Sequence, residues 1–123
     1  MKLKNSQIEA AFVCFREIGR QKYPALLVPK LVNAKRATAG ALDDYNEKRK
    51  DRIDLANELI KEDGADSDAI VKTLNDELEA IANDEVEIEV PKFRASEILI
   101  EGVNLEPNQV DFLDEAGILD MKE

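Results

Sequence analysis

Apolar residues near the start of the chain recur every three or four positions, which is the spacing of a helix that buries one face. This stripe consists of Ile8, Ala11, Phe12, Phe15 and Ile18. Ser6 followed by Glu9 matches a capping box, so a helix is expected to begin there. Gly19 directly after the stripe predicts its end.

A much longer helical pattern follows and extends to Asp63-Gly64. It begins near Tyr23-Pro24, or at Pro29 if that proline occupies the first turn instead of kinking the helix. A bend is expected within residues 37–40, because glycine is a poor helix former. The apolar positions that carry the pattern are Leu31, Ala34, Leu42, Tyr45, Ile53, Ala56 and Ile60. Its charged middle predicts a helix that either projects from the rest of the molecule or packs against it by a narrow seam.

A third helix is predicted to begin at Asp66 or Ser67, either of which can accept a hydrogen bond from the first turn. It is expected to end near Asn83. Its buried side should carry the apolar residues Ile70, Leu74, Leu78 and Ile81.

From residue 85 the period changes to two, which is typical of a half-buried strand. Val86, Ile88 and Val90 alternate there with Glu85, Glu87 and Glu89. Residues 93–105 are compatible with either a helical turn or a strand. A last helix is predicted to begin at Pro107 and to end at Gly117, with Ile118 packing back after the glycine.

Together these segments predict an α+β fold that is mainly helical. It has two or three helices, the second long and with a bend expected, a small β element, and a short C-terminal helix. The 123 residues, 44% of them hydrophobic, suit a single domain. We expect residues 1–84 to form its helical part and residues 85–119 a smaller strand, turn and helix part.

Composition indicates where in the cell the protein is expected. No run approaches the ~20 apolar residues that a membrane-spanning helix needs, so no membrane association is expected. The N-terminal residues lack a signal-peptide pattern, and the single Cys14 cannot form an internal disulfide. A cytoplasmic location is therefore expected, with Cys14 as a packing residue.

Known catalytic signatures are missing from the sequence. The chain has no histidine, and its five glycines form neither a P-loop nor a dinucleotide fingerprint. Glu85, Glu87 and Glu89 are able to hold Mg²⁺ in principle, but a solvated strand face explains them better. The prediction is a protein that is not an enzyme and that needs no metal or cofactor.

Charge is distributed unevenly. Residues 1–52 contain 12 Lys or Arg and 6 Asp or Glu, a net +6, whereas residues 53–123 contain 5 and 21, a net −16. The preferred interpretation is that the fold interleaves both signs on solvated faces. Two others stay open, namely head-to-tail self-association and recruitment of a charged partner at one end. The formal net charge of −10 argues against direct nucleic-acid binding, while mimicry of nucleic acid by the carboxylates is an alternative.

Exposed carboxylates are the candidate partner-binding residues. They form two groups, the strand residues Glu85, Glu87 and Glu89 and the helix residues Asp43, Asp44 and Glu47. An alternative contact for a dimer is an apolar seam on the long helix around Leu42, Tyr45 and Ile53.

The order of several residue patterns resembles a loose group of small proteins of uncharacterised function from tailed bacteriophages and prophages. These patterns are Met1–Ile8, the helix start Lys22-Tyr23-Pro24-Ala25, the helix with Leu74, Glu77, Leu78 and Ile81 leading into Glu85–Glu89, then Ile98, Val103, Leu105 and Pro107. The resemblance spans most of the chain, contains no chemical signature and implies no functional residue.

The expected function is that of a phage or prophage accessory protein that works by binding another protein, for example by inhibiting a host defence or regulatory protein. The alternative is a virion component or a component used in head or tail morphogenesis. Under this alternative the expected location is the virion. A host or phage protein is the expected partner, and a homo-oligomer is a further possibility.

Overall fold

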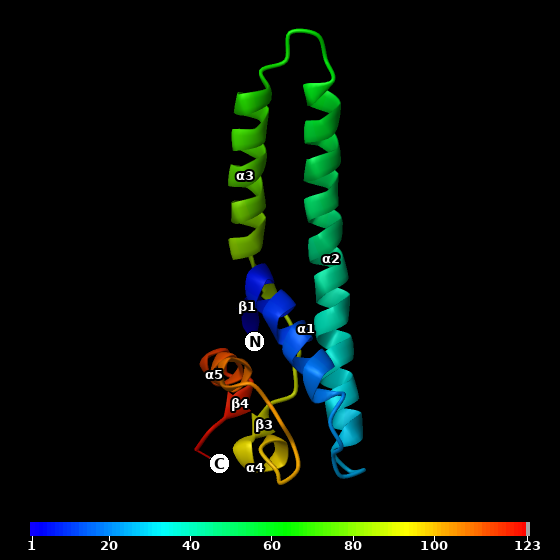
Figure 1. Cartoon of the computed structure of the whole chain (residues 1–123), viewed down its shortest axis with the longest axis vertical. Helices are drawn as coiled ribbons and strands as arrows, with labels where there is room; N and C mark the ends of the chain where they lie inside the picture. Colours follow the sequence, from blue (N-terminus) through cyan, green and yellow to red (C-terminus); the bar gives the residue numbers. More distant parts are fainter. Residues whose placement is uncertain (123) are drawn as a thin grey trace.

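Three long helices set the shape of the molecule (Figure 1), and the computed structural model describes residues 1–122. The helices are α1 (Asn5–Ile18), α2 (Val28–Ile60), α3 (Ser67–Asn83), α4 (Ala95–Ile98) and α5 (Pro107–Glu115). The strands are β1 (Lys2–Lys4), β2 (Glu85–Glu87), β3 (Phe93–Arg94) and β4 (Leu119–Asp120). The predicted mainly helical fold, with a long second helix, small strands and a short C-terminal helix, is confirmed.

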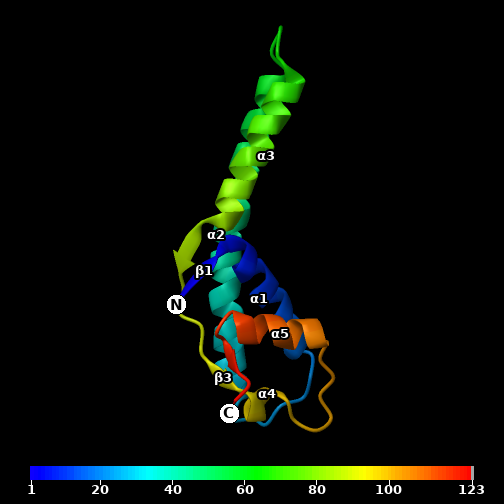
Figure 2. The same ribbon diagram turned by 90° about the vertical axis from the view of Figure 1, so that its left-hand side faces the viewer.

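The first half of α2 lies against α1, while its second half continues beyond α1 and pairs with α3 (Figures 1 and 2). This α2–α3 hairpin projects from the rest of the molecule, which we call the body. An ion pair between Arg49 and Glu9 at 3.4 Å joins α2 to the first half of α1. The sequence offered a projecting helix or a narrow seam as alternatives, and the hairpin combines the two.

The core of the body is built around one face of α1. Ile8, Ala11, Phe15 and Ile18 are all at most 2% exposed, and the Phe15 ring lies 5.8 Å from the ring of Phe93. The predicted stripe is therefore correct except at Phe12, which is only half-buried. Apolar residues from the segment after residue 85 belong to the same cluster, so both parts of the chain share one core.

The start of α1 differs from the prediction. The helix begins at Asn5, and the Gln7 side chain accepts a hydrogen bond from the Lys4 amide at 2.9 Å, the role expected of Glu9 toward Ser6. The reason is the buried Asn5, whose side-chain amide donates to the Ile81 carbonyl at 2.9 Å. This contact fixes α1 against the end of α3, so the helix starts one residue before the expected cap.

Helix α2 starts at Val28 with Pro29 in its first turn, which is the second of the two predicted starts. It continues without interruption through residues 37–40, so the expected bend does not break the helix. Thr38 is fully buried there, and its hydroxyl donates to the Ala34 carbonyl at 3.0 Å, which satisfies the only polar group of this side chain.

Two small sheets close the body. Strand β1 pairs with β2 in antiparallel register, and β3 pairs with β4 in parallel. The end of α5 follows the prediction: Gly117 adopts a φ of 79°, and the amide of the buried Ile118 donates to the Leu113 carbonyl at 3.0 Å. This glycine-based cap turns the chain back so that β4 can reach β3.

Candidate functional site

In the projecting half of the hairpin, each of the two helices packs against the other and against no third element among residues 1–122 (Figure 1). None of the residues of α3 is fully buried, and beyond Tyr45 only Ala56 of α2 is. Asp66 caps α3 as predicted, with its carboxylate accepting from the Ala69 amide at 3.2 Å. Two helices alone cannot cover each other's apolar faces, so side chains that would form a core in a larger bundle remain in contact with solvent.

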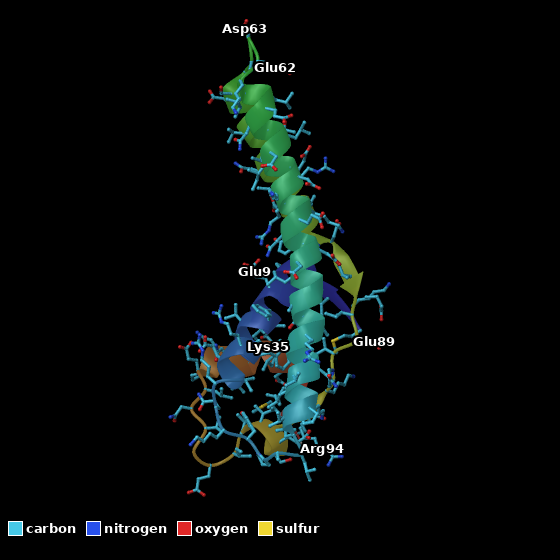
Figure 3. All side chains as sticks on the ribbon, turned by 90° about the vertical axis from the view of Figure 1, so that its right-hand side faces the viewer. Glu9, Lys35, Glu62, Asp63, Glu89 and Arg94 are labelled. Carbon is cyan, nitrogen blue, oxygen red and sulfur yellow. The ribbon has the colours of Figure 1, made fainter. Side chains whose placement is uncertain are left out.

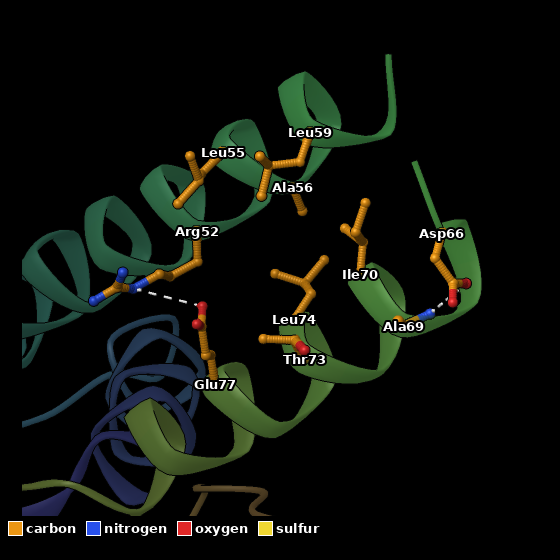
Figure 4. Close-up of a pocket in the computed structure, with 10 residues that line it drawn as sticks. All are labelled: Arg52, Leu55, Ala56, Leu59, Asp66, Ala69, Ile70, Thr73, Leu74 and Glu77. Atoms are coloured by element: carbon orange, nitrogen blue, oxygen red, sulfur yellow. Dashed lines mark hydrogen bonds and ion pairs between the residues drawn. The ribbon is translucent and has the colours of Figure 1, made fainter. Parts of the chain in front are cut away.

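A groove of about 240 Å³ runs between the two helices in the projecting half of the hairpin (Figure 4). Ala56 is 6% exposed, whereas the α2 residues Leu55 and Leu59 are 47% and 38% exposed. Ile70 and Leu74 supply apolar surface from α3. The groove therefore offers apolar surface that no other part of the described chain, residues 1–122, covers.

Charged side chains mark both ends of the groove. Arg52 and Glu77 form an ion pair at 3.9 Å across its inner end, and Asp66 lies at its outer end (Figure 4). The surrounding hairpin is strongly acidic, because residues 51–79 contain ten Asp or Glu and three Lys or Arg, a net charge of −7. An apolar groove inside an acidic surface suits an amphipathic segment with basic flanks.

The predicted strand carboxylates lie elsewhere. Glu85 and Glu87 are opposite Lys4 and Lys2 in the β1–β2 register, so each carboxylate has a cationic neighbour within the chain. Glu89 is exposed beyond the end of β2.

The second predicted group, Asp43, Asp44 and Glu47, is exposed on α2. None of the six predicted carboxylates lines the groove. The sequence predicted Ala56, Ile70 and Leu74 as apolar positions of the two helices but did not predict the groove that they line. Leu55 and Leu59 fall outside the predicted apolar stripe of α2 and were the signal for it.

The apolar seam proposed for a dimer is mostly internal. Tyr45 is 4% exposed, with the Arg49 guanidinium 4.0 Å from its ring centroid, and Leu42 packs against the core. Only Ile53, at 40% exposed, is accessible. A dimer through this seam would require α2 of each copy to separate from the residues that it now packs against.

Cys14 places a free thiol in the core. It is 4% exposed, and burial raises the pKa of its thiol to about 11. The thiol is therefore protonated at neutral pH, which suits the packing role predicted for it.

Among residues 1–122, no group of three or more Cys, Asp or Glu side chains is arranged to hold a metal ion. Within the same residues, no helix combines the length and apolar character needed to cross a bilayer.

No protein-family model matches this chain, and neither a curated protein nor a solved structure is significantly similar to it. The resemblance to small phage proteins therefore stays a prediction.

Proposed function

We propose that this chain is a non-enzymatic accessory protein that acts by binding another protein in the groove of its α2–α3 hairpin. The observation that carries the proposal is the groove itself, with leucine side chains 38–47% exposed on the part of the molecule farthest from the core. A helix or extended segment placed there would add the third layer that the hairpin lacks and would bury its apolar surface.

The resemblance to phage proteins favours a partner inside the infected bacterium, such as a defence or regulatory protein that is inhibited when it is bound. The acidic hairpin would speed the approach of a basic partner surface. A second candidate is a morphogenesis or virion component. It is supported by the opposite charges that lie at the two ends of the molecule, the acidic hairpin and the basic start of α2.

Capture of partner proteins from a bacterial lysate, with the wild type and two matched variants as bait, tests the proposal. Leu55→Asp places a charge in the groove, whereas Ile53→Asp places the same charge two residues earlier, on the other side of the helix and outside the groove. The two positions are similarly exposed, at 47% and 40%. We expect a partner that is captured by the wild type and by Ile53→Asp and lost with Leu55→Asp.

Circular dichroism of both variants should show that they retain their helices. If the two variants and the wild type capture the same proteins in the same amounts, the groove is not the binding site.

A further inference from the structure

A second apolar surface is exposed at the start of α2, on the body. We call it the ridge and define it as Leu26, Val28 and Val32. Leu26 is 97% exposed, which is extreme for a leucine, and Val28 and Val32 are 44% and 37% exposed. Val28 and Val32 are four residues apart and so share one face of the helix. Val28 and Val32 border a hollow with Tyr23, whereas Leu26 borders another beside Pro24, so the ridge presents apolar side chains around the first turn of α2.

Basic residues surround the ridge. Lys22, Lys35 and Arg36 are exposed beside it, and residues 16–36 contain six Lys or Arg and one Glu, a net +5. The neighbouring segment 92–106 contains two Lys or Arg and three Glu, which leaves +4 for the two segments together. Residues 107–122, which also belong to the body, contain four Asp or Glu and one Lys, a net −3, so the basic character is confined to the immediate flanks of the ridge.

The ridge and the groove lie toward opposite ends of the long axis of the molecule. The hairpin loop is at one end, whereas the start of α2 is at the other (Figure 1). Figure 3 shows Glu62 and Asp63 at the hairpin tip and Arg94 near the far end. One end thus combines an apolar groove with a charge of −7 over residues 51–79, and the other combines an apolar ridge with basic flanks.

We infer that the groove of one copy receives the ridge of a second copy, in a head-to-tail contact. The inference rests on the proposed function, because it assigns an occupant to the same groove. Charge favours this contact over a symmetric one, since pairing two hairpins would bring two surfaces of −7 together. Because the two surfaces differ, a head-to-tail dimer leaves one groove and one ridge free, and the assembly grows unless it closes into a ring.

The mass of the wild-type protein in solution gives the first test. Sedimentation or light scattering should show a mass that rises with concentration at about 0.05 M salt and falls toward the monomer at about 1 M salt. A strict monomer up to about 0.2 mM at low salt overturns the inference.

Two single-ended variants give the sharper test. Leu26→Asp damages the ridge at a nearly fully exposed position, and Leu55→Asp damages the groove. We expect each variant alone to lose self-association, with a Kd raised by at least about tenfold. Mixed in equal amounts they should form dimers, because one copy supplies an intact groove and the other an intact ridge. Ile53→Asp, outside the groove, should associate like the wild type.

The remaining outcomes separate this inference from the proposed function. If Leu26→Asp associates like the wild type, the contact does not use the ridge, and the inference is wrong. If the wild type is monomeric but a foreign partner is still lost with Leu55→Asp, the inference fails and the proposed function stands. If Leu55→Asp changes neither self-association nor partner capture, both fail.

Discussion

Lys30 of α2 forms an ion pair with Glu97 of α4, with Nζ 3.1 Å from Oε1. The same ammonium lies 4.6 Å from the ring centroid of Phe93, and the Glu97 carboxylate also accepts a hydrogen bond from the Arg94 amide at 2.9 Å. The pair joins the basic first part of the sequence to the acidic second part inside one molecule, as Arg52 and Glu77 do in the hairpin. The Lys30–Glu97 contact favours the interleaved interpretation for the charges of the body. The hairpin still has an excess of carboxylates, and residues 16–36 an excess of cations.

Glu97→Gln should lower the free energy of unfolding by about 0.5–1 kcal/mol at pH 7, the usual range for a partly exposed pair. The hydrogen bond from the Arg94 amide, followed by that from Lys30, holds the pKa of this carboxyl below its ordinary value of 4.5. The folded protein therefore favours the charged form, and the stabilisation is present above pH 4.5 and lost as the pH falls through the folded-state pKa.

Urea unfolding of the wild type and of Glu97→Gln at pH 7 and at about pH 3 checks this expectation. Glutamine still accepts the Arg94 hydrogen bond, so the difference reports the charge. Glu101→Gln, at an exposed position in the same region, serves as the control. A difference that is as large at low pH as at neutral pH would contradict the assignment.

Cys14 should react slowly with thiol reagents in the folded protein at pH 8 and rapidly after unfolding. Its folded-state pKa of about 11 exceeds the ordinary value of 9.0, so between these values the unfolded chain loses the thiol proton first. Stability is therefore unaffected below pH 9 and falls as the pH rises toward 11, by up to about 2–3 kcal/mol.

Cys14→Ala removes this contribution, so its stability should decline less steeply than that of the wild type over the same range. Complete labelling of the native thiol within seconds at pH 8 would show that the side chain is accessible and would rule out the buried environment.

Phe15→Ala should cost about 3–5 kcal/mol, because Phe15 is 2% exposed and packs 5.8 Å from the Phe93 ring. Phe12→Ala should cost clearly less, about 1–2 kcal/mol, because its side chain is half-buried. Denaturant unfolding of the two variants provides the comparison. Equal losses would mean that Phe12 has a contact that its position on α1 does not explain.

The sequence predicted the features that depend on neighbouring residues. The Asp66 cap and the Gly117-Ile118 ending of α5 are each determined by a few neighbouring residues, and the structure confirms them. It also confirms the α1 stripe except at Phe12. The start of α1 was wrong because Asn5 is fixed by the Ile81 carbonyl, 76 residues away, and that contact overrides the local capping pattern.

The site was harder to predict for a similar reason. Glu85 and Glu87 looked like a free acidic face, but the pairing of β2 with β1 places Lys4 and Lys2 opposite them, and strand register over such a separation leaves no local pattern. The groove exists only because α3 turns back along α2. Leu55 and Leu59, outside the predicted stripe of α2, were the signs of it in the sequence.

The hairpin should be the first part of the structure to open. The second half of α2 and the whole of α3 lose few buried contacts on opening. Ala56 is the only buried residue of α2 beyond Tyr45, and no residue of α3 is buried. Amide hydrogen exchange should therefore be faster in residues 53–80 than in α1. Thr73→Leu, which adds apolar volume to the groove wall, should slow exchange in the hairpin and leave α1 unchanged.

Measurement at about 1 M salt keeps the protein monomeric if the head-to-tail contact forms, so that protection by a second copy does not hide the opening. Lowering the salt should then protect the groove residues of α2 and α3 together with the start of α2, because both surfaces become covered. Equal protection of the hairpin and α1 at high salt would mean that the two open together in global unfolding. The hairpin would then not be a separately opening unit.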